Sequence, residues 1–134
     1  MERKSAYEVE LANMPVGLDR AILRVLSYHV GKTAAIGRMD LVRQVGQLGC
    51  ATTERQLREA IKQLRRGKDG QPSYLICSAA GEDGGYYLAS SRQEYEEFRK
   101  IEYAGKISDM AETMSAMDQA AQKAFGAGVQ PGLF

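Results

Sequence analysis

Basic side chains gather in one short stretch of this 134-residue chain. Residues 55–68 hold six lysines and arginines against a single glutamate. Neutralisation of phosphate dominates the affinity of proteins for nucleic acid, so a helix with this charge suits a polyanion. At about 100° per residue, the leucines and the isoleucine of the segment TERQLREAIKQLRR fall on one side of a helix. The opposite face is centred on Arg55, Glu59, Lys62 and Arg66, with Arg58 and Gln63 at its flanks.

The order of these side chains along the predicted helix indicates how they would meet double-stranded DNA. An α-helix fits the major groove, and the N-terminal part of such a helix touches base edges. Arg55 and Arg58 lie at that end, and Gln56 and Gln63 could also contact bases. Glu59 could accept from cytosine N4 or pair with Arg55 and Lys62. The candidates for phosphate contacts are Thr52, Thr53, Lys62, Arg65, Arg66 and Lys68.

The residues needed for other chemistry are scarce. The two cysteines, Cys50 and Cys77, are isolated, and with one histidine, His29, they form neither a zinc-ligand pattern nor a disulfide framework. No nucleophile–base pair, glycine-rich phosphate loop or carboxylate pair is recognisable in the sequence, which argues against an enzyme. No metal and no cofactor are implied.

Composition and charge fit one ordinary domain with an appendage. The chain is 44% hydrophobic and 26% charged, which is typical of a globular protein. Residues 1–70 hold 13 basic and 8 acidic side chains, a balance of +5, and residues 71–134 hold 5 and 9, a balance of −4. The start MERKSAYEVE lacks the apolar stretch of a signal peptide, and no apolar run approaches the ~18 residues that span a bilayer. We therefore expect a cytoplasmic protein that does not contact membranes.

The first part of the chain is expected to supply an arm and a helix. Residues 1–16 show no clean period, and the alternation around Val9 indicates a short strand or an ordered arm. From Leu18 to Val30, apolar residues recur at spacings of three and four, which predicts an amphipathic helix. Gly31 can close this helix, and His29 is expected in its last turn, where a partial positive charge favours the helix dipole.

The cationic helix is the third of three, and a hairpin follows it. A second helix is expected at about residues 38–46. The third begins at Thr53, because Thr53 and Gln56 have the spacing of a capping box, and Gly67 ends it. Glycines in the connection AAGEDGG permit the positive φ angles that a hairpin turn requires. The two strands of that hairpin are expected at residues 74–78 and 86–89.

A long helix is expected over residues 91–125. Ser91 and Glu94 have the spacing of a second capping box, and no proline interrupts residues 92–125. The aromatic part with Tyr95, Phe98 and Ile101 is expected to pack on the preceding domain. The later part has the 4-3 spacing of a heptad seam, whose dimerisation residues would be Ile107, Met110, Met114, Met117 and Ala121.

Three partners remain open for this methionine-rich seam. A second copy of the chain is preferred, because a dimer doubles the phosphate contacts and matches two half-sites on DNA. The seam could also fold back on its own domain. Its soft, adaptable methionine surface could instead bind a different protein.

Three short helices and a hairpin, with a cationic third helix, resemble the winged helix-turn-helix family over residues 17–90. The likeness lies in the segments LVRQVGQLGCATTERQLREAIKQLRR and YLICSAAGEDGGYYLAS. The combination resembles small phage or prophage proteins, often placed beside replication genes. The resemblance implies an α+β, mostly helical fold, with three helices, a β-hairpin wing and then the long C-terminal helix. The wing tip departs from the family, because Glu82 and Asp83 stand where a DNA-contacting wing carries Arg or Lys.

Three functions are compatible with this resemblance. The first is a phage-type DNA-binding protein that acts in DNA replication in the host bacterial cytoplasm. The alternative is a dimeric transcriptional regulator of phage genes that uses the same helix. The second alternative is a protein-interaction module that inhibits or redirects a host enzyme, and the acidic wing tip favours it because phosphate would repel that tip.

The tail, residues 126–134, carries a second resemblance. Gln130, Leu133 and Phe134 fit the pattern Gln-x-x-Leu-Phe, which resembles the peptide by which bacterial replication proteins dock onto the sliding clamp. The resemblance implies that the two apolar side chains fill a pocket and that Gln130 makes the orienting hydrogen bond. Pro131 departs from the commoner leucine. The alternative is an apolar tail that packs locally.

A peptide experiment tests the tail. We expect a synthetic peptide ending in GVQPGLF to bind a bacterial sliding clamp, and one ending in GVQPGAA not to bind. Two buried apolar side chains contribute about 1.5–3 kcal/mol each, less the ordering entropy of the peptide, which predicts a micromolar Kd at best. Surface plasmon resonance measures both peptides. If both bind equally, or neither binds, transcriptional regulation replaces replication as the first function.

Overall fold

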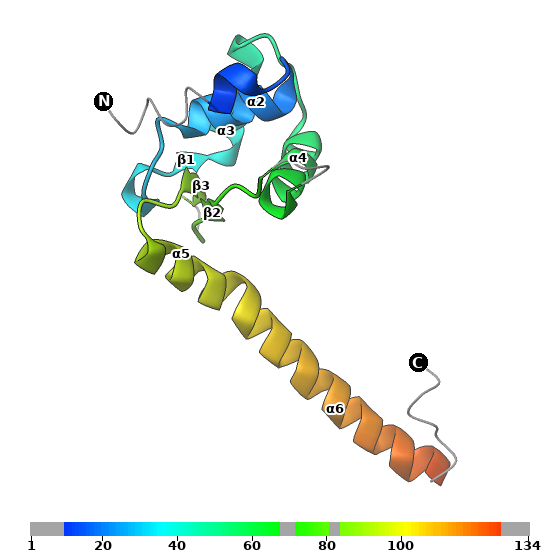
Figure 1. Ribbon diagram of the computed structural model, residues 1–134. Helices are drawn as coiled ribbons and strands as arrows, with labels where there is room; N and C mark the ends of the chain where they lie inside the picture. The colour runs from blue at the N-terminus through cyan, green and yellow to red at the C-terminus, as the bar shows by residue number, and fades with distance from the viewer. Residues whose placement is uncertain (1–9, 68–71, 81–83, 127–134) are drawn as a thin grey trace. The chain divides into compact units, whose positions relative to one another are not determined.

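The computed structural model describes residues 10–67, 72–80 and 84–126 (Figure 1). The fold is α+β and mostly helical, with one small antiparallel sheet and a long C-terminal helix. The chain divides into two compact units, residues 1–96 and residues 97–134.

The first unit alternates helices and short strands. Residues 10–13 are helical. The elements that follow are α2 (Leu18–Leu26), the 3-10 turn η1 (Lys32–Ala34), β1 (Ile36–Gly37), α3 (Arg38–Gln47), α4 (Glu54–Arg66), β2 (Ile76–Ser78) and β3 (Gly85–Leu88). The strand order is β1-β3-β2, and both pairings are antiparallel. The three helices contact one another pairwise, while α2 contacts β3, α3 contacts β1 and α4 contacts β2.

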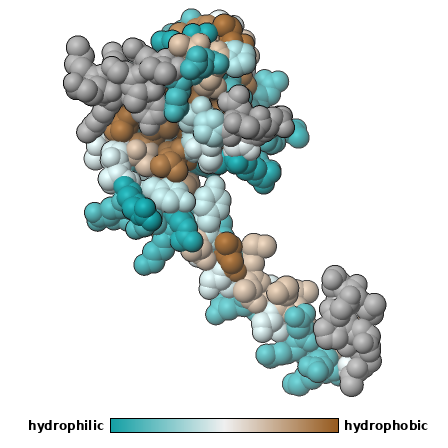
Figure 2. All heavy atoms as spheres, in the orientation of Figure 1, coloured by the Kyte–Doolittle hydropathy of each residue, from teal (hydrophilic) through white to brown (hydrophobic). Residues whose placement is uncertain are grey.

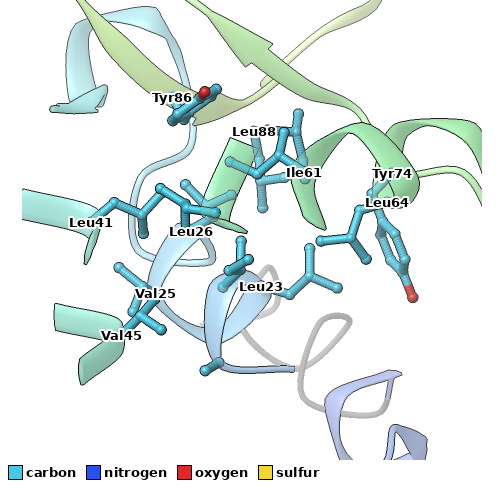
Figure 3. Packing of buried hydrophobic residues seen from close by; sticks show 14 of the residues in the cluster. Leu23, Val25, Leu26, Leu41, Val45, Ile61, Leu64, Tyr74, Tyr86 and Leu88 are labelled. Atoms are coloured by element: carbon cyan, nitrogen blue, oxygen red, sulfur yellow. The ribbon is translucent and has the colours of Figure 1, made fainter. Parts of the chain in front are cut away.

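The hydrophobic core lies where these elements meet. Figure 3 shows its side chains converging from the three helices and the sheet. The most deeply buried large side chains are Ile22, Leu26, Leu41, Val45, Leu57, Ile61, Ile76, Cys77 and Leu88. No charged or polar side chain is fully buried within the described residues. Burial of apolar area is therefore the main force that holds this unit together.

The predicted hairpin is confirmed, with a first strand shorter than expected and a second strand that begins one residue earlier. β2 covers Ile76–Ser78 because the Tyr74 amide still donates to the Leu64 carbonyl of α4, at 2.9 Å. On the other strand, Gly85 lies against the backbone of β1, where an added Cβ would overlap the Ile36 carbonyl oxygen. Only glycine permits this close approach, so Gly85 is required for the β1–β3 pairing.

In the N-terminal part, the strand alternative is wrong for the described residues, and the first helix is shorter than predicted. Residues 10–13 are helical and Leu11 is buried in the core, while residues 1–9 of the expected arm lie outside the described residues. The first predicted helix ends at Leu26, before Val30, because Val30 forms a β-bridge with Leu88 on the sheet. His29 therefore lies beyond the helix, and its Nδ1 donates to the Ala34 carbonyl at 2.7 Å.

Residues 92–125 are helical, and one π-helical turn interrupts the regular α-helix. The elements are α5 (Arg92–Arg99), a π-helical turn η2 (Lys100–Ala104) and α6 (Gly105–Phe125). The π turn widens the spacing that brings side chains onto one face from four residues to five. Phe98 and Tyr103, five residues apart, accordingly make an edge-to-face contact with ring centroids 5.7 Å apart. Ile101, expected to be packed, is instead 71% exposed.

The second capping box forms with a different partner for Glu94. The Ser91 hydroxyl accepts from the Glu94 amide at 3.1 Å, as the spacing predicts. The Glu94 carboxylate accepts from the Ser90 amide at 2.8 Å, the Ser90 hydroxyl at 3.1 Å and, from η1, the Lys32 amide at 2.9 Å. Partial burial acts to raise the pKa of Glu94, but the hydrogen bonds from Lys32 and Ser90 outweigh it and lower that pKa below its ordinary value.

This carboxylate makes stability depend on pH. Because the pKa of Glu94 is lower in the folded protein, its charge stabilises the fold above the ordinary carboxyl pKa, and this is lost as pH falls through the folded value. We expect Glu94→Gln to lower the free energy of unfolding by about 1 kcal/mol at pH 7, and the difference from wild type to shrink under acid. Urea unfolding between pH 7 and pH 3 measures this. Glu97→Gln, on the same helix, is the control, and an equal or pH-independent loss would contradict the account.

Candidate nucleic-acid interface

The face of α4 that points away from the core is cationic. Leu57, Ile61 and Leu64 are buried, which fixes the rotation of the helix about its axis. Figure 2 shows hydrophilic atoms gathered over α4. The exposed side chains of the helix include the four cations of the predicted face and its one acid, namely Arg55, Arg58, Lys62, Arg66 and Glu59.

Local hydrogen bonds define where this helix begins and ends. The Thr53 hydroxyl accepts from the Gln56 amide at 3.1 Å, and the Gln56 side-chain oxygen accepts from the Thr53 amide at 3.1 Å. This confirms the predicted capping box. Gly67, with φ of 72°, follows the last helical residue. The Thr53 and Gln56 amides are thus satisfied internally, and the Gln56 oxygen is already engaged.

Arg65 lies on the hairpin side of α4, apart from the other predicted phosphate ligands. Its Nε donates to the Ile76 carbonyl of β2 at 2.7 Å, and its Nη2 lies 3.5 Å from the Ser78 hydroxyl. Its guanidinium carbon is 6.0 Å from the centroid of the Tyr86 ring. The structure therefore gives Arg65 a role in joining α4 to the sheet, and its expected phosphate contact stays a prediction.

Arg38, which the sequence reasoning missed, belongs beside this surface. It starts α3, and its Nη1 lies 3.4 Å from the Glu54 carboxylate at the start of α4. The same Glu54 oxygen lies 3.9 Å from Arg58 Nε. The sequence signal was weak, because an arginine at the start of the second helix shows no periodic link to the third.

A groove occupies the other flank of α4. It has a volume of about 650 Å³ and lies between residues 14–19 and the helix. Its lining from α4 is Gln56, Glu59, Ala60, Gln63 and Leu64, and Gly67 after the helix adds to it. Within this set Gln63 Nε2 is 3.4 Å from Glu59 Oε1. Both predicted base-reading glutamines thus border the groove and not the centre of the cationic face.

Burial keeps the Cys77 thiol and the Tyr86 hydroxyl protonated at neutral pH. Burial raises the pKa of the Cys77 thiol to about 11, although the nearby Arg65 charge acts to lower it. Burial also raises the pKa of Tyr86, against the lowering effect of Arg65, Arg38 and Arg58. A protonated thiol is a poor nucleophile, so Cys77 is a packing residue. Cys50 is a free, half-buried thiol.

The four large side chains of the α6 seam are exposed. Ile107, Met110, Met114 and Met117 are between 62 and 71% exposed, and Ala121 is half-buried. Figure 2 shows hydrophobic atoms beside hydrophilic ones over α6. Several predicted functional residues lie outside the described part of the chain, namely Lys68, Glu82, Asp83, Gln130, Leu133 and Phe134.

Within residues 10–67, 72–80 and 84–126, no three side chains among His, Cys, Asp and Glu lie close enough to hold a metal ion. In the same part of the chain, no helix is both long and apolar enough to cross a membrane. No protein-family model, curated protein sequence or solved structure matches the chain.

Proposed function

We propose that this chain is a winged-helix protein that binds double-stranded DNA with α4 in the major groove. The order α2, β1, α3, α4, β2, β3 and the sheet order β1-β3-β2 support a winged helix, in which β2 and β3 form the wing. The observation that carries the proposal is the exposed cationic face of α4, because the core-facing leucines leave four cations on the opposite side.

The length and the charge order of α4 fit this role. Its 13 residues span about 20 Å, and a helix of this diameter enters the major groove. Arg55 and Arg58 lie in the first half of the helix, where base edges are read. Lys62 and Arg66 lie one and two turns further on and would bind phosphates, which supply most of the salt-dependent affinity.

The cellular role proposed first is DNA replication. The support is the C-terminal pattern of Gln130, Leu133 and Phe134, through which the chain would dock on a bacterial sliding clamp. Regulation of phage transcription is the alternative, and it needs only the DNA-binding unit. A protein-interaction module is the third candidate, and it predicts that duplex DNA does not bind.

We also propose that the chain acts as a homodimer through α6. The exposed seam of Ile107, Met110, Met114 and Met117 supports this, because side chains at heptad spacing on one copy interlock with the same spacing on another. Two copies would present two α4 helices to two half-sites, and the joint affinity would exceed that of one copy.

Substitutions on α4 test DNA binding. We expect Arg55→Ala and Arg58→Ala each to cost about 1–3 kcal/mol on a duplex selected by the wild-type protein, and to relax its sequence preference. Lys62→Ala and Arg66→Ala should weaken binding to all duplexes alike and reduce the slope of log affinity against log salt by about one. Fluorescence anisotropy measures both effects. Arg99→Ala, an exposed arginine on α5, is the control, and unchanged affinity in all four α4 variants would refute the proposal.

A charge in the seam tests the homodimer. We expect Met114→Glu to dissociate the dimer, because a carboxylate in an apolar interface costs several kcal/mol. Gln119→Glu adds the same charge to the opposite side of α6 and should leave the dimer intact. Light scattering gives the mass, and circular dichroism checks that the helix content is kept. A wild-type protein that is monomeric at high concentration would contradict the dimer.

A further inference from the structure

One carboxylate lies between two arginines that come from different helices. Glu54 Oε1 is 3.4 Å from Arg38 Nη1, on α3, and 3.9 Å from Arg58 Nε, on α4. We call Arg38, Glu54 and Arg58 the arginine bridge. Its side chains are partly exposed, at 53, 39 and 56%, so a ligand can reach them.

A carboxylate at this place needs an explanation. Phosphate repels a negative charge, so an acid beside a DNA-binding face lowers affinity for any duplex. Two adjacent guanidiniums neutralise Glu54 and leave a net charge of +1 on the bridge. Glu54 therefore contributes something other than attraction to the phosphates of DNA.

A carboxylate beside an arginine can fix the orientation of its guanidinium group. A guanidinium is planar and presents its donors in a fixed fork, so its orientation decides which acceptors it reaches. Arg58 is a long side chain that would otherwise sample many rotamers. Arg58 Nε lies 3.9 Å from Glu54 Oε1, within ion-pair range, so its two terminal nitrogens would be available to a base. Arg38, on α3, also contacts the Glu54 carboxylate. The carboxylate is therefore positioned by two helices and not by the first turn of α4 alone.

We propose that Glu54 is a specificity-determining positioning residue that acts through Arg58 and is braced by Arg38. The proposal rests on the function proposed above, that α4 reads duplex DNA. It assigns to α3 a part in sequence discrimination without a base contact of its own. Glu54 is expected to lower the affinity for every duplex and to raise the discrimination between duplexes. These two effects have opposite signs, so they can be measured separately.

Helix stability is the competing explanation for Glu54. An acid in the first turn also interacts favourably with the helix dipole. Glu54→Asp separates the two explanations, because it keeps the charge at the helix start but shortens the side chain by one methylene. Both bridge distances would then lengthen, while the dipole interaction would remain.

The experiment measures a ratio of dissociation constants for the full-length chain. The probes are a duplex selected by the wild-type protein from random sequence and a scrambled duplex of the same composition. We expect Glu54→Asp to lower the ratio of scrambled to selected Kd by at least about threefold, with the thermal unfolding midpoint unchanged. Arg38→Ala should lower the same ratio. Glu97→Asp shortens an exposed acid on α5 in the same way, outside the bridge and the face of α4, so it should leave the ratio unchanged.

A second background shows whether Glu54 works through Arg58. In an Arg58→Ala protein, Glu54→Asp should cause no further loss of discrimination, because the side chain it positions is gone. A ratio that Glu54→Asp leaves unchanged, or an equal loss in the Arg58→Ala background, would overturn the proposal. If Lys62→Ala and Arg66→Ala still weaken binding in those cases, DNA binding by α4 stands and only the bridge fails. A wild-type chain that binds neither duplex would overturn both.

Discussion

The rotation of α4 about its own axis is the constraint on which the proposed surface depends. Leu57, Ile61 and Leu64 are buried, so the helix cannot turn without exposing them. Each would lose about 1.5–3 kcal/mol of burial in that case, which is more than any single surface charge contributes. The apolar core therefore decides which basic residues face outward. The cationic face is a consequence of packing, and the proposed interface needs no ligand to form it.

The same packing gives neighbouring arginines different roles. Arg66 is exposed on the outer face, while Arg65, one residue earlier, reaches the Ile76 carbonyl of β2 and joins the helix to the sheet. Arg58 lies between Arg65 and Arg66 in its direction from the helix axis. It contacts Glu54, which also contacts Arg38 of α3. A count of basic residues would treat them alike. Arg65 and Arg66 are one position apart on the helix, yet they face different surroundings. The position of a residue around the helix axis, more than its type, therefore determines what it can contact.

Local signals predicted much of the fold and of the face of α4. The capping box of Thr53 and Gln56 and the spacing of Leu57 and Ile61 act within one or two turns, so the sequence alone reveals them. Contacts between distant residues were not predictable. Examples are the bridge from Val30 to Leu88, which ends the first helix early, and the hydrogen bond from Lys32 to Glu94, 62 residues apart. The exposure of Ile101 also depends on a π turn that no spacing rule revealed. Replication, transcription and dimerisation stay predictions.

Nuclear magnetic resonance of the 15N-labelled chain during titration with a selected duplex tests the central claim most directly. If α4 enters the major groove, the largest shift changes belong to the backbone and side-chain nitrogens of Arg55, Arg58, Lys62 and Arg66. Amides of residues 14–19, across the groove from α4, and of α6, in the other unit, should change less than these. Largest changes on α6 or on the groove segment, or no change at saturating duplex, would contradict the account.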